Sequence, residues 1–154
     1  MKRRLASRDP AGATRTVFKH AFGHTPTHLI KAPARLELLG HHAEWNDGLS
    51  LAVAIDRHLC IASAPRLDGR IELVTSAYPQ REKFWLSELA ANSDAPWTWL
   101  VKAILRTLRE RGVHFGGFNA AVHSEIPPGV GFGSSGALLA AAALTVRQLY
   151  PHKL

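Results

Sequence analysis

Residues 126–138 of this 154-residue chain contain the residue types whose spacing points most clearly to chemistry. Three glycines stand at alternate positions and two serines follow directly: Gly129, Gly131, Gly133, Ser134 and Ser135. Glycine lets the backbone turn sharply and lets a ligand approach its N–H groups. A helix beginning at the serines would add unpaired N–H groups and a favourable dipole. The segment therefore predicts a phosphate cradle over residues 127–135, with the serine hydroxyls as candidate Mg²⁺ ligands.

A simpler interpretation of the same segment is an ordinary strand-to-helix connection in which a serine caps the helix. Two familiar phosphate loops fit poorly. A Walker loop needs G-x-x-x-x-G-K-[ST], but no lysine occurs between Lys102 and Lys153. The spacing G-x-G-x-x-G is present, but Pro127 and Pro128 separate it from the preceding strand, which disfavours a dinucleotide fold. We prefer the phosphate cradle, because three alternate glycines exceed what a cap requires.

A second polar segment, residues 33–48, follows an apolar strand. It gathers donors and acceptors beside a tryptophan: His41, His42, Glu44, Asn46 and Asp47. Such a cluster suits a polyhydroxylated ligand, because each buried hydroxyl needs a hydrogen-bond partner. Arg35, near the end of the strand, could stabilise the charge of a transferred phosphoryl group.

This polar segment has two other interpretations. His41, His42 and Glu44 could bind a metal ion, but adjacent histidines on an extended loop point in opposite directions and the spacing H-E-x-x-H is absent. A polar turn is the stronger alternative, above all for Asn46 and Asp47, which precede a glycine.

The helices that must position these segments are predicted from apolar periodicity. A short helix is expected over residues 14–22, ended by Gly23. The clearest helix lies between Pro96 and Gly112, with Lys102 among the polar residues on its solvent face. A last helix is expected over residues 134–149, where four consecutive alanines allow close packing on a sheet.

Strands are predicted around these helices. Residues 29–39 indicate a strand broken at Pro33. Residues 51–74 contain two β-rich runs around the turn dipeptide Asp68-Gly69, which predicts a hairpin. Apolar residues alternate with polar ones over residues 118–126, which is typical of a half-buried strand.

Composition fits one globular domain, with 46% hydrophobic and 20% charged residues. The single cysteine, Cys60, favours a reducing compartment, so we expect a cytoplasmic protein, and no apolar run indicates a membrane span or a secretory signal. Residues 1–20 hold six lysines and arginines against one aspartate, whereas the rest hold thirteen against eleven acidic residues. The net charge of +7 therefore comes mainly from a basic N-terminal arm, which favours a solvated tail over a nucleic-acid surface. We expect residues 1–13 of this arm to be flexible.

Four blocks of the sequence, in order, resemble the superfamily of galactokinase, homoserine kinase, mevalonate kinase and phosphomevalonate kinase, and galactokinases most of all. They are FKHAFGHTPTHLIKAPARLELLGHHAEWNDG, LAVAIDRHLCIASAPRLDGRIELV, PWTWLVKAI and PPGVGFGSSGALLAAAAL. The resemblance runs from about Thr16 to Tyr150 and implies an α+β fold. That fold is the N-terminal domain of a GHMP-type kinase, with a ribosomal S5 domain 2-like sheet, packed helices and a left-handed β-α-β crossover.

The resemblance also implies an activity, the ATP-dependent phosphorylation of a sugar hydroxyl, with Mg²⁺ bound beside the nucleotide. It implies that Arg35 stabilises the transferred phosphoryl group. It assigns sugar contacts to His41, His42 and Glu44, and it places Trp97 near the adenine base. The nucleotide phosphates are assigned to Gly129, Val130, Gly131, Phe132, Gly133, Ser134 and Ser135, with Ser135 also meeting Mg²⁺.

The sequence departs from the galactokinase pattern at two sugar positions. His41 stands where the family has glutamate, and Glu44 where it has aspartate, so the identity of the sugar stays open. In galactokinases the general base and the second lobe follow the phosphate loop. We therefore expect residues 14–154 to be the N-terminal domain of such a kinase, without its C-terminal domain and inactive alone.

Three further expectations accompany this interpretation. The main alternative function is a non-catalytic module that binds a sugar or a nucleotide. A nucleic-acid protein that uses residues 1–20 is a weaker alternative, and it predicts affinity that falls steeply with salt. An apolar face left exposed would favour self-association or pairing with a C-terminal half.

Overall fold

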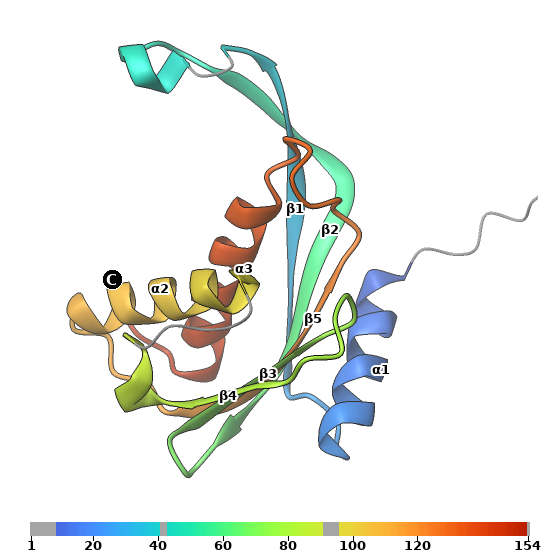
Figure 1. Cartoon of the computed structure of the whole chain (residues 1–154), viewed down its shortest axis with the longest axis vertical. Helices are drawn as coiled ribbons and strands as arrows, with labels where there is room; N and C mark the ends of the chain where they lie inside the picture. Colours follow the sequence, from blue (N-terminus) through green and yellow to red (C-terminus); the bar gives the residue numbers. More distant parts are fainter. Residues whose placement is uncertain (1–8, 41–42, 91–95, 154) are drawn as a thin grey trace, which may run out of the picture.

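The computed structural model describes residues 9–40, 43–90 and 96–153, and it shows a mixed α+β fold. The expected fold class is confirmed. Three α-helices, five strands and two short 3-10 helices follow one another along the described chain (Figure 1). Their order is α1 (Pro10–Phe22), β1 (His28–Leu39), η1 (Ala43–Asn46), β2 (Leu51–Arg66), β3 (Arg70–Thr75), β4 (Glu82–Trp85), η2 (Leu86–Glu88), α2 (Pro96–Glu110), β5 (Gly117–Ser124) and α3 (Ser134–Leu149).

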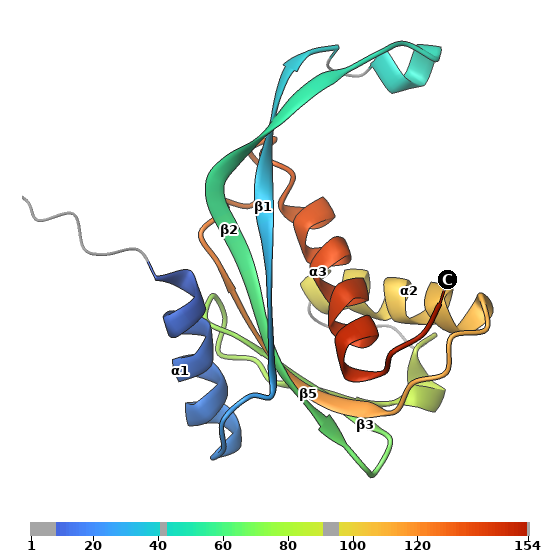
Figure 2. The same ribbon diagram turned by 180° about the vertical axis from the view of Figure 1, so that it is seen from behind.

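The five strands form one sheet in the order β1-β2-β5-β3-β4. Neighbouring strands are antiparallel except for β3 and β5, which are parallel and are joined through β4, η2 and α2. Helix α1 covers one face of the sheet, and α2 and α3 cover the other (Figures 1 and 2). None of the helices in the described part of the chain combines the length and the apolar character needed to cross a bilayer.

The hairpin expected over residues 51–74 is wrong in its pairing. The two strands form on either side of the Asp68-Gly69 turn, but β5 lies between them: Ala121 of β5 is the register partner of Ala62 on β2 and of Val74 on β3. Gly117, at the start of β5, makes this possible because a Cβ atom there would collide with the carbonyl oxygen of Arg70. Turn chemistry therefore reversed the chain without making the strands neighbours.

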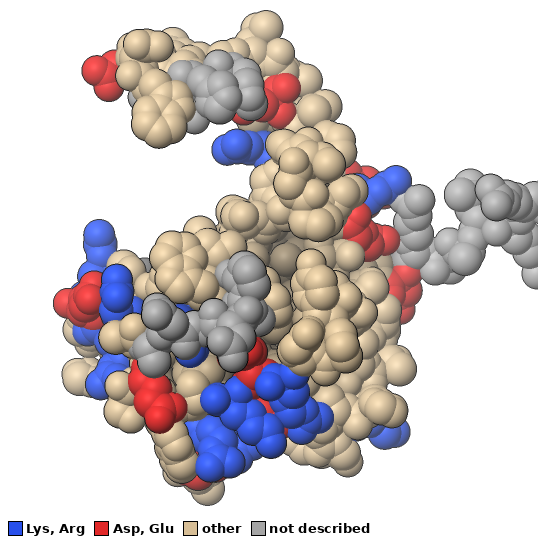
Figure 3. All heavy atoms as spheres, viewed as in Figure 1, with Lys and Arg blue, Asp and Glu red and all other residues tan. Residues whose placement is uncertain are grey.

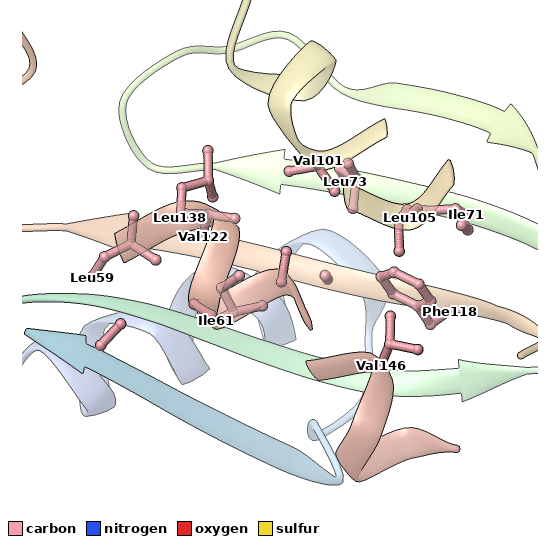
Figure 4. Close-up of a cluster of buried hydrophobic side chains, with 14 of the residues drawn as sticks. Leu59, Ile61, Ile71, Leu73, Val101, Leu105, Phe118, Val122, Leu138 and Val146 are labelled. Carbon is pink, nitrogen blue, oxygen red and sulfur yellow. The ribbon is translucent and has the colours of Figure 1, made fainter. Parts of the chain in front are cut away.

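The half-buried strand expected at residues 118–126 is also corrected. All six residues of β5 from Gly117 to Val122 are buried, because helices cover both faces of this central strand. The larger core lies between the sheet and α2 and α3, and Figure 4 shows Leu59, Phe118 and Val146 among its side chains. Alternate β5 residues such as Ala121 belong instead to a smaller core beneath Phe18 of α1.

Helix α1 begins four residues before the expected start, so residues 10–13 are helical instead of part of a flexible arm. Asp9 caps the helix by accepting a hydrogen bond from the Gly12 N–H at 2.9 Å, and Pro10 suits the first helical position. Gly23 ends the helix with φ of +77°, as expected. Behind α1, burial raises the pKa of the Cys60 thiol, which stays protonated and packs as a small apolar group.

The other two helices lie where they were expected, but one side chain does not. Lys102 was expected on the solvent face of α2, yet it is 5% exposed and its Nζ lies 4.6 Å from the centroid of the Phe84 ring. The reason is that β4 and η2 cover that flank of α2, where Arg109 also donates to the Leu86 carbonyl oxygen at 2.7 Å. Amphipathic periodicity identifies only the apolar face of a helix, so it could not predict that Lys102 on the polar face would pack against Phe84.

Strand β1 passes through Pro33 with a register shift instead of breaking there, because an edge strand tolerates a missing N–H. Strand β5 pairs with β2 only from Leu59 onward, so residues 51–58 pair with β1 alone. The two strands project from the sheet as a two-stranded arm, which carries η1 at its tip (Figure 1). Exposed leucines such as Leu39 and Leu49 lie along it.

Candidate functional site

The loop between β5 and α3 turns at its three alternate glycines. Gly129, Gly131 and Gly133 have φ values of +74°, +84° and +71°, a region that other residues rarely adopt. Ideal Cβ atoms at Gly129 and Gly131 would meet nothing within 4 Å, so the space beside the loop is open. The backbone conformation predicted from the glycine spacing is therefore present.

Helix α3 begins at Ser134, as predicted, but neither serine caps it. The N-cap is Gly133, which makes no side-chain hydrogen bond, and its carbonyl oxygen accepts from Ala137 N–H at 2.9 Å. The alternative of an ordinary serine cap is thus corrected. The hydroxyls of Ser134 and Ser135 have no hydrogen-bond partner within the described ranges, and both residues line a cleft. Free hydroxyls and free N–H groups at a helix start are suited to an anion.

Arg35 lies against this loop, although 97 residues separate it from Phe132 in the sequence. The Arg35 backbone N–H donates to the Phe132 carbonyl oxygen at 3.0 Å. A Cβ atom at Gly133 would lie 3.4 Å from the Arg35 Cβ. The Arg35 side chain is 61% exposed, and its Nη2 forms a long ion pair of 3.9 Å with Glu37 Oε2, so the guanidinium stays accessible to a ligand. The ring of Phe132 packs against the main core.

A cleft of about 600 Å³ opens beside the start of α3. One wall carries Ser134, Ser135 and Pro128, and apolar residues of the sheet form its floor. Figure 3 shows the molecule deeply hollowed between the arm and the helices. The cleft is mainly apolar with hydroxyls at one end, which suits a ligand that joins a flat apolar group to an anionic tail.

Trp97 lines this cleft, and its expected place near an adenine base stays a prediction. Its indole Nε1 is buried and has no hydrogen-bond partner in the described structure. An unpaired buried donor costs free energy, which a ligand acceptor would recover. The cleft therefore contains both an unsatisfied donor and unsatisfied hydroxyls.

The lining residues that the sequence interpretation missed include Tyr78, Gln80 and Glu82. Tyr78 and Gln80 lie in the connection after β3, and Glu82 is the first residue of β4. A mixed aromatic and amide segment directly after an apolar strand was the available signal. The sequence could not show that this segment lines the cleft, because that depends on β3 running parallel to β5. The parallel pairing brings the ends of both strands to the cleft.

The expected sugar residues lie mostly beyond what the structure describes. His41 and His42 are outside the described residues, and of Glu44 only the backbone, in η1, is described. Asp47 has a φ of +52°, and Gly48 N–H donates to the Ala43 carbonyl oxygen at 2.8 Å. The turn interpretation of residues 46–48 is therefore confirmed. Among the described residues there is no group of three His, Cys, Asp or Glu side chains that could hold a metal ion.

Two family models match the chain. The galactokinase galactose-binding signature matches residues 16–65, and the GHMP kinase N-terminal domain matches residues 99–154. The first contains Arg35 and the arm, and the second contains the glycine loop and α3. Each matched region therefore contains one of the two segments that the structure brings together.

Solved structures share this fold. Galactokinase from Lactococcus lactis, solved with galactose, is 22% identical with a TM-score of 0.86, over 95% of this chain and 39% of that one. Mevalonate kinase from Methanococcus jannaschii is 23% identical with a TM-score of 0.70, over 82% and 41%. Phosphomevalonate kinase from Streptococcus pneumoniae, solved with phosphomevalonate and AMPPNP, is 17% identical with a TM-score of 0.64, over 83% and 38%. The chain spans about two-fifths of the length of these proteins.

The fold and the glycine loop define the N-terminal domain of a GHMP kinase. Residues 16–65 match the galactokinase galactose-binding signature. The chain thus combines that signature with a GHMP kinase N-terminal domain matched over residues 99–154.

Proposed function

We propose that this chain provides the nucleotide site and part of the substrate site of a sugar kinase. The reaction is the transfer of the γ-phosphoryl group of ATP to a sugar hydroxyl. The observation that carries the proposal is the contact between Arg35 and the glycine loop beside a cleft with unsatisfied hydroxyls. That contact places a solvent-accessible cation next to a backbone suited to phosphates.

In this proposal the loop from Gly129 to Ser135 surrounds the ATP phosphates. The positive-φ glycines let the phosphates approach the loop N–H groups closely, and the start of α3 adds its own N–H groups. The base occupies the apolar end of the cleft, where the Trp97 Nε1 donates to an acceptor on the base. A relative solved with AMPPNP supports a nucleotide ligand for this fold.

The donor set fits Mg²⁺ bound chiefly by phosphates. Magnesium prefers oxygen ligands and is usually held by substrate phosphates with one or two protein groups. The Ser135 hydroxyl is exposed to the cleft and has no protein partner among the described residues, so it can serve as that group. Bound Mg²⁺ would neutralise part of the charge on the transferred group.

Arg35 has the role of stabilising the phosphoryl group during transfer. The sugar oxygen forms a bond to the γ-phosphorus while the bond from that phosphorus to the β-bridging oxygen breaks, and ADP leaves. Charge accumulates on the equatorial oxygens, and a guanidinium can bind two of them at once. Because the backbone N–H of Arg35 is fixed to Phe132, the side chain starts from a position set by the loop itself.

We infer that the sugar is galactose or a close relative, bound through His41, His42 and Glu44. The support is the galactokinase signature over residues 16–65 and the galactose complex of the Lactococcus lactis enzyme. Of these positions, the structure describes the backbone of Glu44, which lies in η1 at the tip of the arm. A sugar contacted by the arm would then lie on the Arg35 side of the phosphates.

Calorimetric titration of the full chain with ATP, with and without Mg²⁺, tests the nucleotide part of the proposal. We expect saturable binding that tightens with Mg²⁺, and a smaller Mg²⁺ effect in Ser135→Ala. Ser87→Ala, which removes an exposed hydroxyl in η2, is the matched control and should behave like the parent chain. Absence of ATP binding, or an unchanged Mg²⁺ effect in Ser135→Ala, would contradict the assignment.

Galactose titration tests the substrate part separately. We expect galactose to bind, and to bind more tightly when ATP and Mg²⁺ are present, because both ligands would share one site. Glucose serves as the comparison, since it differs from galactose at a single hydroxyl. Equal affinity for both sugars would leave a sugar site without galactose preference and would contradict the choice of galactose.

A further inference from the structure

A second pocket, of about 340 Å³, lies on α1 and the loop that follows it. We call it the α1 pocket. Its lining residues are Arg15, Thr16, Lys19, Thr25 and Pro26. Helix α1 covers the sheet face opposite to α2 and α3, so this pocket is separate from the cleft at the start of α3 (Figure 2).

The lining of the α1 pocket contains two cations and no carboxylate. Arg15 and Lys19 are four residues apart, so both project from one side of the helix. Like charges at this spacing destabilise a helix slightly. Lys19 lies in the last turn, where the helix dipole favours a cation, but Arg15 lies in the middle and gains nothing from the dipole. The pair therefore has a cost that the helix itself does not compensate.

Neither cation is paired with a protein group. Arg15 and Lys19 make no ion pair or hydrogen bond with any residue that the structure describes. Arg81 and Lys83, by contrast, both approach the buried carboxylate of Glu72. At the α1 pocket, two cations share one cavity without a described carboxylate to neutralise them.

The hydroxyls of the α1 pocket have different roles. Thr16 already donates to the Gly12 carbonyl oxygen at 3.0 Å, so its oxygen is left as an acceptor. The Thr25 hydroxyl has no partner among the described residues and can donate. The pocket then offers a guanidinium, an ammonium and one hydroxyl as donors, without an opposing negative charge. This donor set matches a dianionic oxyanion.

We propose that the α1 pocket binds the phosphate group of a small phosphorylated molecule or inorganic phosphate. Arg15 binds two phosphate oxygens through its planar guanidinium, and Lys19 and Thr25 bind the others. Two cations balance a dianion, whereas a nucleic acid would need a longer row of cations along its backbone. The inference does not depend on the proposed kinase function, because the two sites share no residue.

Amide chemical-shift mapping of the full chain during titration with inorganic phosphate, with ionic strength held constant by chloride, tests the inference. We expect saturable shifts at residues 15–19 and 25. In Arg15→Gln/Lys19→Gln these shifts should weaken by at least about tenfold in apparent Kd, because each lost charged hydrogen bond is worth about that factor. Arg147→Gln, which removes another exposed arginine, should retain them.

The outcomes separate this pocket from the kinase site and from a nucleic-acid surface. Shifts confined to residues 129–137 would show phosphate binding at the glycine loop alone and would overturn the inference. Equal shifts in the double variant would do the same. A single-stranded DNA oligonucleotide that shifts residues 15–25 when inorganic phosphate does not would replace the inference with nucleic-acid binding. Free inorganic phosphate and a sugar phosphate, titrated separately, distinguish the two sources of the phosphate group.

Discussion

The backbone N–H of Arg35 donates to the carbonyl oxygen of Phe132 at 3.0 Å, which joins strand β1 to the glycine loop. Each partner has a further constraint. Phe132 packs its ring into the main core, and Gly133 brings its α-carbon close to the Arg35 side chain. The loop and the strand that carries the galactokinase signature are therefore positioned by one shared contact. The first two predictions separate its backbone part from its side-chain part.

Gly133→Ala tests the backbone part. An alanine at a φ of +71° costs about 1 kcal/mol, and relief of that strain would move the loop away from Arg35. We expect ATP affinity to fall about fivefold to tenfold. Gly23→Ala is the control: it has a φ of +77°, meets no atom within 4 Å and lies at the end of α1. It should lose similar stability in urea unfolding without loss of ATP affinity, and equal effects on ATP binding would contradict the prediction.

Arg35→Gln tests the side-chain part, because the backbone N–H contact to Phe132 is retained. Loss of the guanidinium should weaken ATP binding about tenfold, measured by calorimetry at low salt, and the difference should shrink as salt rises. Arg57→Gln removes a partly exposed arginine of β2, which donates to the neighbouring Asp56 carbonyl oxygen and makes no ion pair with a described residue. That control should bind ATP like the parent chain. A salt-independent loss would point to a structural effect instead.

Trp97→Phe tests the unpaired indole donor in the cleft. Affinity for ATP should fall about tenfold, because the buried Nε1 no longer donates to the base. The unfolding midpoint of the ligand-free chain should change little, since relief of an unpaired donor offsets lost ring contacts. Trp99→Phe, at a position 57% exposed on α2, should alter neither quantity. If Trp97→Phe keeps full ATP affinity, Trp97 is not a base contact.

The turn between β2 and β3 predicts a pH dependence of stability. The Arg66 guanidinium, hydrogen-bonded to both Asp68 oxygens, holds the pKa of that carboxyl far below its ordinary value of 3.8. A lowered pKa in the folded state stabilises the fold above pH 3.8, and this contribution is lost as pH falls toward the folded value. The stability difference between the parent and Asp68→Asn, measured by urea unfolding, should therefore be largest at neutral pH and shrink below pH 3.8. A difference that grows on acidification would contradict this.

The sequence predicted the parts of the site that depend on local backbone chemistry. The three alternate glycines indicated a loop that only glycine could form, and their φ values are all positive. The helix from Ser134 to Leu149 was predicted with both ends correct, because its periodicity and the preceding glycine act over a few residues. The polar turn at residues 46–48 was equally local.

Other features could not be predicted because they depend on residues that are distant in the sequence. Asp68 and Gly69 indicated a reversal of the chain, but the insertion of β5 between β2 and β3 depended on Gly117, nearly fifty residues later. The burial of Lys102 depended on Phe84, and the role of Tyr78 and Gln80 in the cleft depended on the same strand order. A one-dimensional pattern carries no information on which strand becomes a neighbour.

The amino-acid order alone thus determined where the backbone must bend, where helix α3 starts and which side chains are able to bind an oxyanion. Only the tertiary structure decided which of them meet: it placed Arg35 on the glycine loop and left Arg15 and Lys19 beside an open pocket. The physical reason is the distance along the sequence over which each kind of interaction acts. Conformational preferences of glycine, proline and capping residues act within one turn of chain, whereas the assembly of a site requires long loops to close around a shared core.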